Sequence, residues 1–150
     1  MVHVQLRWQG GMRFGSEDGR WSLDVPPEQG GSGAGPAPME TVLAALAGCT
    51  GMDVVAILQR MREPLEELQV EVEGERAQEH PRVYTRVHVR YRFAGARLRP
   101  EAVARAVRLS QERYCPVSAM LRASARVTYD VELNGQPLAP SGEAGDPADR

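Results

Sequence analysis

The feature that most constrains the fold of this chain is the apolar stretch from Gly35 to Met61, GPAPMETVLAALAGCTGMDVVAILQRM. At about 3.6 residues per turn, one face of a helix over this stretch carries the larger side chains and the other the small ones. The first face holds Met39, Val42, Leu43, Leu46, Thr50, Val54, Ile57 and Met61, and the second holds Ala44, Ala47, Gly48, Gly51 and Val55. Because a helix without a polar face must be covered on both sides, the stretch predicts a buried central helix and suggests that a partner subunit supplies part of the cover.

The predicted helix begins near Pro38, since proline is tolerated in the first helical turn and Glu40 complements the positive end of the helix dipole. The stretch approaches the length of a transmembrane helix, about 20 apolar residues. However, Glu40, Asp53, two threonines and two glycines interrupt it. We therefore expect a helix of the protein core and no membrane partner.

Composition limits the remaining possibilities. A chain of 150 residues with 42% hydrophobic content is expected to form one domain with a substantial core. A net charge of -2 argues against a nucleic-acid partner.

The opening residues have neither a basic segment nor an apolar segment typical of a secretory signal, so we expect a cytoplasmic protein. A structural disulfide is improbable there, which leaves Cys49 and Cys115 as either inert core residues or a redox pair.

Alternating patterns predict the strands. Residues 2–8, a short strand around Met12 to Phe14, and Trp21 to Val25 form an expected three-stranded meander with glycine-containing turns. A loop rich in proline, glycine and serine, 26–38, then leads into the central helix. Two long strands are expected at about 67–77 and 82–93, and a last strand at 125–133.

The two long strands have one apolar and one charged face. The predicted apolar face carries Leu68, Val70, Val72, Val83, Val87, Val89, Tyr91 and Phe93. The other face sets Glu71, Glu73 and Glu75 against Arg86, Arg90 and Arg92. Opposite charges on neighbouring strands favour antiparallel pairing, and they predict a solvated sheet face rather than an anion site.

A second helix is expected from Pro100, with Val103, Ala106, Val107, Ser110 and Tyr114 on its inner face. Cys115-Pro116 ends this helix and begins a short helical turn through Leu121. Cys115 would therefore occupy an N-cap-like position, where backbone N–H groups would lower the pKa of its thiol. The order of elements predicts an α+β domain over residues 1–134, with antiparallel sheets packed on the long helix, and a disordered tail over 135–150.

Two segments, PMETVLAALAGCTGMDVVAILQR and LSQERYCPVSAML, resemble the OsmC/Ohr family of osmotically inducible and organic-hydroperoxide-resistance proteins. The resemblance covers nearly the whole chain up to Leu133. It implies an OsmC-like fold, in which two intertwined subunits form a homodimer with both central helices buried. It also places two sites at the subunit interface.

In the peroxidases of that family, the cysteine that matches Cys49 is the thiolate that attacks the peroxide, and the cysteine that matches Cys115 resolves the product. The resemblance thus implies a small hydroperoxide substrate and no bound cofactor or metal. It also implies an external dithiol reductant, for which a lipoyl protein is a candidate. If so, the two cysteines must lie close enough to form a disulfide within one subunit.

The resemblance also implies an arginine from the opening strands and a glutamate near the start of the central helix, which together hold the thiolate. Arg13 is the nearest candidate for the arginine, and Arg20 is an alternative. Glu40 is the nearest glutamate, but Met39 stands where the organic-hydroperoxide branch has this residue. We call this arginine and glutamate pair the arginine clamp. The sequence does not decide whether this protein has it.

Two function classes follow. The first is a thiol-dependent peroxidase, an enzyme that uses Cys49 and Cys115. The second is a non-catalytic dimeric stress or binding protein that holds an apolar ligand in the same interface cleft, with both cysteines only lining it. A common fold does not decide between them, because function depends on the site.

Overall fold

The structure, a computed structural model, describes residues 1–138. The chain divides into two compact units, Met1–Val42 and the part that begins at Leu43. The mixture of helices and antiparallel strands confirms the predicted α+β class, whereas the single domain over residues 1–134 stays a prediction.

The N-terminal unit contains the predicted meander in a shorter form. Strands β1 (Arg7–Trp8), β2 (Phe14–Gly15) and β3 (Ser22–Leu23) pair antiparallel in that order. The loop that follows contains one short 3-10 helix, η1 (Pro27–Gln29). The long alternating strand expected at residues 2–8 is thus reduced to its last two residues.

A buried carboxylate organises the loop after β3. The side chain of Asp24 accepts hydrogen bonds from the Ser32 hydroxyl at 2.7 Å and from the backbone N–H groups of Val25, Ser32 and Ala34. The hydroxyl of Ser32, followed by the N–H groups of Ala34 and Val25, lowers the pKa of Asp24 to about 2. The composition of the loop predicted irregular structure, and this ionised side chain gives the loop a defined shape.

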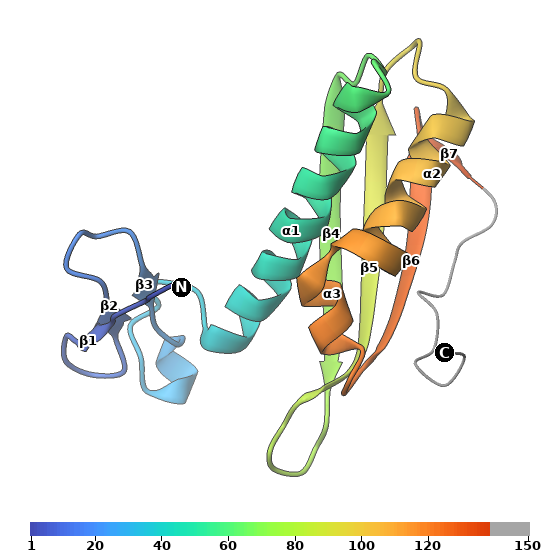
Figure 1. Cartoon of the computed structure of the whole chain (residues 1–150). Coiled ribbons are helices and arrows are strands. Elements are labelled where there is room, and N and C mark those ends of the chain that lie inside the picture. The colour runs from blue at the N-terminus through green and yellow to red at the C-terminus, as the bar shows by residue number, and fades with distance from the viewer. Residues whose placement is uncertain (139–150) are drawn as a thin grey trace. The chain divides into compact units, whose positions relative to one another are not determined.

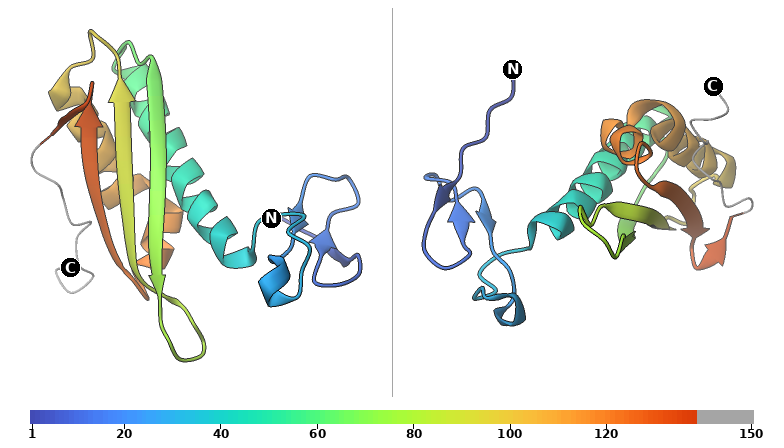
Figure 2. Two further views of the ribbon diagram at one scale, coloured as in Figure 1. Left: turned by 180° about the vertical axis from the view of Figure 1, so that it is seen from behind. Right: turned by 90° about the horizontal axis from the view of Figure 1, so that it is seen from below.

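The second unit contains a four-stranded sheet. Figures 1 and 2 show its helices on one face of this sheet. The strand order is β4-β5-β6-β7. Its strands are β4 (Glu67–Arg76), β5 (Tyr84–Ala94), β6 (Arg126–Leu133) and β7 (Gln136–Pro137). The helical elements are α1 (Pro38–Arg60), whose first five residues belong to the N-terminal unit, α2 (Pro100–Leu109), the π-helical segment η2 (Ser110–Tyr114) and α3 (Pro116–Leu121).

The sheet is mixed rather than fully antiparallel. Strands β4 and β5 pair antiparallel as predicted, but β5 and β6 pair parallel. The prediction of antiparallel sheets was wrong for this pair because α2, η2 and α3 connect the two strands. A helical crossover returns the chain to the edge where it started, so the next strand runs in the same direction.

The inner face of the sheet is apolar, as predicted. Leu68, Val70 and Val72 lie opposite Phe93, Tyr91 and Val89. Val83 is an exception, because it is 40% exposed while its neighbour Tyr84 is 5% exposed. The pairing shifts register between Glu75 and Arg76. Such an irregularity breaks the alternation of side chains between the two faces. The prediction that Val83 lies on the apolar face was therefore wrong, because it assumed strict alternation up to this end of the strand.

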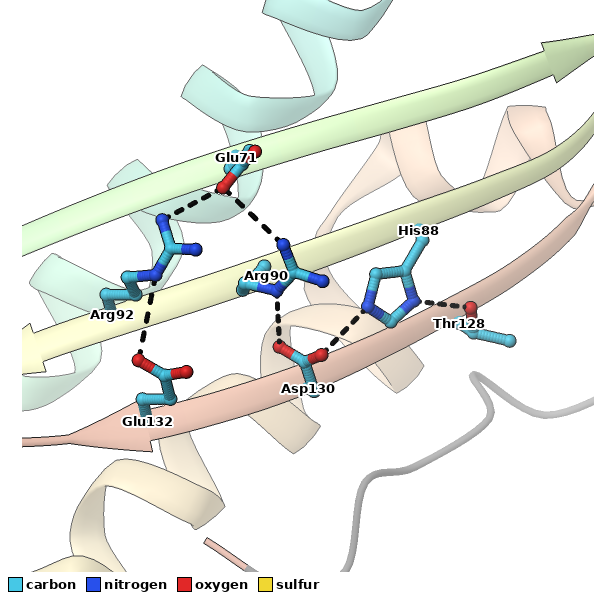
Figure 3. Close-up of polar contacts among 7 residues, drawn as sticks. All are labelled: Glu71, His88, Arg90, Arg92, Thr128, Asp130 and Glu132. Carbon is cyan, nitrogen blue, oxygen red and sulfur yellow. Dashed lines mark hydrogen bonds and ion pairs between the residues drawn. The ribbon is translucent and has the colours of Figure 1, made fainter. Parts of the chain in front are cut away.

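The outer face carries the predicted opposite charges as a connected network (Figure 3). One oxygen of Glu71 lies 2.9 Å from Arg92 Nη1 and 3.7 Å from Arg90 Nη1. Asp130 on β6 lies 3.4 Å from Arg90 Nε and 3.0 Å from His88 Nε2. We call these five residues, together with Thr128 and Glu132, the outer network. Opposite-charge pairing between β4 and β5 is therefore confirmed.

The last described residues extend the sheet. Asn134 and Gly135 have φ values of 50° and 79°, which suit the tight turn that connects β6 to β7. Beyond β7, the N–H of Leu138 donates to the carbonyl of Val131 at 2.8 Å. Residues 136–138, which were predicted as part of a disordered tail, thus pair with β6, and the rest of that tail, 139–150, lies outside the described residues.

Candidate functional site

The two cysteines and one carboxylate form a compact cluster in the second unit. Cys49 and Asp53 lie one turn apart on α1, and Cys115 directly precedes α3. The two Sγ atoms and a carboxylate oxygen of Asp53 all lie within 4.8 Å of one another. Both thiols are free; Cys49 is partly exposed and Cys115 is buried. The structure thus brings together the two cysteines that the sequence singled out.

Cys115 occupies the predicted N-cap position, where its Sγ accepts a hydrogen bond from the backbone N–H of Ser118 at 3.4 Å. Burial nevertheless raises the pKa of the Cys115 thiol to about 12, and the hydrogen bond to Cys49 and the negative charge of Asp53 act in the same direction. The predicted lowering of this pKa was therefore wrong, because desolvation outweighs one helix N–H group. Cys115 is a neutral thiol at physiological pH.

The π-helical segment η2 positions Cys115. It continues α2, and its widened turn is closed by a 2.8 Å hydrogen bond from the Cys115 N–H to the Ser110 carbonyl. Segments of this kind are frequent at functional sites. Ser110, which was predicted on the inner face, and Gln111, which was not, are both buried, whereas Tyr114 is 50% exposed. The prediction that Tyr114 lies on the inner face was thus wrong, because it assumed a regular helical period.

A chain of buried polar side chains leads away from the cluster. Asp53 accepts a hydrogen bond from the Ser110 hydroxyl at 2.9 Å. Ser110 Oγ lies 2.8 Å from Thr50 Oγ1, which lies 2.6 Å from the Tyr91 hydroxyl. Gln111 Nε2 also donates to that hydroxyl, at 2.5 Å. The chain ties α1, β5 and η2 together beside the thiols.

A second arm of this chain returns to Cys115. Gln111 Oε1 accepts a hydrogen bond from the Ser118 hydroxyl at 2.9 Å, and Ser118 Oγ accepts one from Arg122 Nη2 at 3.2 Å. Ser118 also supplies the N–H group that reaches Cys115. We call Thr50, Tyr91, Ser110, Gln111 and Ser118 the inner network. These side chains are at most 1% exposed, and their mutual hydrogen bonds fix the helices that carry both thiols.

The sequence analysis treated Asp53 only as an interruption of the apolar stretch and did not place it in the site. Its spacing of four residues from Cys49 was the available signal, since such positions share a helix face. The inner network was also missed. Hydroxyl side chains at otherwise apolar positions, Thr50 on α1 and Ser110 after α2, were its signal.

The other predicted site residues lie in the N-terminal unit. Arg13 lies in the turn before β2, and Arg20 stacks over the Trp21 ring at 5.8 Å from its centroid. One carboxylate oxygen of Glu40 accepts a hydrogen bond from the Ala37 N–H at 2.9 Å, which caps the first turn of α1. Cys49 lies in the second unit, and contact between it and any of these residues stays a prediction.

Comparisons with known proteins agree with the resemblance. The chain matches the family described as OsmC-like protein over residues 30–130. It is 36% identical over 132 residues to protein YhfA of Escherichia coli strain K12, an alignment that covers 88% of this chain and 98% of that protein.

Among solved structures, a hypothetical protein from Aquifex aeolicus VF5 has a TM-score of 0.70 and 26% identity over 89% of this chain and 99% of that one. An organic hydroperoxide resistance protein OsmC from Legionella pneumophila has a TM-score of 0.68 and 20% identity over 88% of this chain and 98% of that one. At that identity, the likeness to the Legionella protein concerns the fold. The family match and the YhfA alignment together show that this chain belongs to the OsmC-like protein family.

Proposed function

We propose that this protein reduces organic hydroperoxides with Cys49 as the attacking thiolate and Cys115 as the resolving thiol. The observation that carries the proposal is that a partly exposed thiol and a buried thiol lie within 4.8 Å of each other. Cys49 is the thiol that a substrate can approach, while Cys115 is protonated and shielded from substrate. The name of the Legionella structure, an organic hydroperoxide resistance protein, agrees with this substrate class.

The reaction has two steps. The Cys49 thiolate attacks the distal peroxide oxygen, the O–O bond breaks, and a proton is taken up, so that a sulfenic acid and an alcohol form. The Cys115 thiol then attacks the sulfenic sulfur, which forms the disulfide and releases water. The sulfur atoms must approach from within 4.8 Å to a bond length of about 2.05 Å. Side-chain rotation at Cys49 and a small shift of the N-terminus of α3 accomplish this.

An external dithiol then restores the pair. Its first thiolate attacks one sulfur of the Cys49–Cys115 disulfide, and its second thiol completes the exchange, so the reductant leaves as a disulfide. Because Cys115 is buried, the exposed Cys49 sulfur is the point of attack. A lipoyl protein fits this chemistry, since a lipoyl group carries two thiols in one small, mobile arm.

The active form in this proposal is a homodimer. Helix α1 is long and apolar enough to cross a membrane by length and composition, a test that core helices also pass. In the single chain, however, its buried residues are Leu46, Thr50, Val54 and Leu58. An apolar groove runs between this helix and β4, lined by Gly48, Gly51, Met52, Val55 and Leu68 among others. Met52 is 74% exposed there. A second copy would cover this surface, and an obligate interface would bury more than about 2,000 Å².

The arginine clamp completes the proposed site. Arg13, or Arg20 in its place, would face the Cys49 thiolate, and a carboxylate would hold the guanidinium in place. Glu40 already caps α1 with one oxygen, and Met39 cannot accept a bidentate bond. We therefore expect slower peroxide reduction than a glutamate at position 39 would allow, and the variant Met39→Glu should consume hydroperoxide faster.

The proposal is tested by following the consumption of cumene hydroperoxide with dihydrolipoamide as reductant. The parent protein should turn over, and Cys49→Ser should fall to the uncatalysed rate. With no reductant added, Cys115→Ser should consume one equivalent of peroxide and stop with Cys49 as a sulfenic acid. Thr128→Val, a change on the outer face, serves as the folded control. A Cys49→Ser protein that consumes peroxide at the parent rate would refute the assigned role. A parent protein that consumes none would favour the non-catalytic binding protein.

A further inference from the structure

The cluster of Cys49, Asp53 and Cys115 has the composition of a metal site as well as that of a redox pair. We propose that, in the reduced protein, these three side chains bind one thiophilic divalent cation, with Zn²⁺ as the best fit. The cation would leave one coordination position open to water. The binding of metal is independent of the peroxidase activity, although its regulatory consequence rests on the proposed function.

The donor set favours zinc over harder cations. Two thiolates and one carboxylate are ligands that Zn²⁺ accepts, whereas Mg²⁺ and Ca²⁺ require sites made of oxygen atoms. Three protein ligands with a free fourth position are typical of accessible zinc sites. Cys49 and Asp53 are partly exposed, so a cation can enter from solvent.

The donor atoms are already near the required spacing. At a Zn–S distance of about 2.3 Å, two thiolates in a tetrahedral site lie about 3.8 Å apart. The three donor atoms here lie within 4.8 Å of one another. A contraction of about 1 Å is therefore sufficient. Rotation about the side-chain torsions of Cys49 and Asp53, both on the rigid helix α1, supplies this contraction.

Hydrogen bonds from outside the cluster orient two of the ligands. The Ser110 hydroxyl donates to Asp53 at 2.9 Å and leaves the other carboxylate oxygen available to a metal. The Ser118 N–H donates to Cys115 Sγ at 3.4 Å, which favours the thiolate form of that sulfur. Such partners of the ligands are a regular part of metal sites and contribute about 10- to 100-fold in affinity.

Charge gives a further argument. The cluster places two thiols and one carboxylate within 4.8 Å of one another, and all three groups carry negative charge when ionised. A divalent cation bound among them would balance these charges. Binding would therefore release up to two protons, one from each thiol that ionises, and the affinity would increase with pH.

A bound cation would also occupy the attacking sulfur. With Cys49 coordinated, its lone pair is shared with the metal and the peroxide cannot be attacked at the usual rate. Release of the cation would restore the reduced pair without any change in oxidation state. Zinc would thus act as a reversible inhibitor of peroxide reduction.

The experiment uses the full-length, reduced protein in a phosphine reductant without chelator. Zn²⁺ is titrated in competition with a chromophoric chelator, and Co²⁺ is added separately to detect a thiolate-to-cobalt charge-transfer band. We expect one Zn²⁺ per chain, a near-ultraviolet cobalt band, and proton release measured with a weakly buffered indicator. Ser110→Ala should weaken Zn²⁺ binding by about 10-fold.

Matched variants separate the site from adventitious binding. Asp53→Asn should weaken Zn²⁺ binding by at least about 10-fold, and Asp130→Asn, the same change in the outer network, should leave it unchanged. Cys49→Ser and Cys115→Ser should each abolish the cobalt band. If a cysteine variant fails to fold, the parent protein in its disulfide form serves instead, and it should bind no Zn²⁺ until it is reduced.

Unchanged Zn²⁺ affinity in Asp53→Asn, or a parent protein without the cobalt band, would overturn the metal site. These results do not depend on peroxide activity. A protein that consumes hydroperoxide in the presence of chelator but binds no Zn²⁺ refutes the metal site alone, and a protein that binds Zn²⁺ but consumes no hydroperoxide refutes the peroxidase alone. Where both are present, added Zn²⁺ should slow consumption and a chelator should restore it.

Discussion

The two faces of the four-stranded sheet carry polar networks that differ in burial and charge. On the inner face, hydroxyl groups such as those of Thr50 and Tyr91 are fully buried and hydrogen-bonded to one another. On the outer face, the side chains of Arg90 and Glu71 are 31% and 38% exposed and form ion pairs (Figure 3). A buried polar group that loses its partner is costly, whereas an exposed ion pair contributes little. The comparison therefore indicates that the inner network, beside the thiols, fixes the site.

Alkaline pH should produce the largest change in the free energy of unfolding, and the titrating groups responsible lie on the inner face. Burial raises the pKa of both Tyr91 and Cys115 to about 12, from ordinary values of 10.0 and 9.0. Folding thus favours their neutral forms, so this stabilisation is complete below about pH 9 and is lost as the pH rises toward 12. At about 1.4 kcal/mol per pKa unit, the loss between about pH 8 and about pH 11 is on the order of 4 kcal/mol. Urea unfolding of the reduced protein at several pH values measures it.

The control for this prediction removes one titrating group at a time. Tyr91→Phe and Cys115→Ser should each flatten the dependence of the unfolding free energy on pH above about pH 9. An unfolding free energy that stays constant up to about pH 11 in the parent protein would contradict the burial of these groups.

The next largest loss in the free energy of unfolding is expected when a single hydroxyl of the inner network is removed. Thr50→Val keeps the shape of the side chain but leaves the hydroxyls of Tyr91 and Ser110 each without one partner. We expect the free energy of unfolding to fall by about 2–3 kcal/mol. Thr128→Val makes the same change in the outer network, where the lost bond is to the partly exposed His88, and it should cost less than about 1 kcal/mol. Equal costs for the two variants would remove the distinction between the faces.

The smallest effect is expected for an ion pair of the outer network. Glu71→Gln weakens contacts with both Arg90 and Arg92, and we expect a loss of about 0.5–1 kcal/mol at low ionic strength. The loss should nearly vanish at about 1 M NaCl, where charges are screened within about 3 Å. Denaturant unfolding at the two salt concentrations measures this. A loss above about 2 kcal/mol that salt does not change would show that the outer network is as important as the inner one.

The elements that were predicted correctly have strong local patterns. The apolar run predicted α1 from Pro38, and alternating residues with opposite charges predicted the pairing of β4 with β5. Features set by tertiary structure were not predictable in this way. The parallel pairing of β6 follows from the helical crossover, and the exposure of Val83 follows from a register shift near Glu75.

In the candidate site, too, some features were predictable from the sequence and others depend on the tertiary structure. The resemblance to a known family selected Cys49 and Cys115, and the structure places them together. The pKa of Cys115 was predicted in the wrong direction, because desolvation depends on the whole fold and not on a helix N-terminus alone. Ser110 was predicted on the inner face but not as a site residue, and Gln111 was missed because the regular helical period does not place it on that face, whereas the π-helical turn of η2 buries it.

The central claim is that Cys49 and Cys115 act as one redox unit, and a single-turnover oxidation tests it most directly. Reduced protein is mixed with one equivalent of cumene hydroperoxide, and free thiols and intact mass are measured after quenching. We predict the loss of two thiols per chain, a mass lower by two hydrogen atoms, and a Cys49–Cys115 disulfide within one chain after proteolysis. A product that keeps both thiols, or one that joins cysteines of different chains, would contradict the claim.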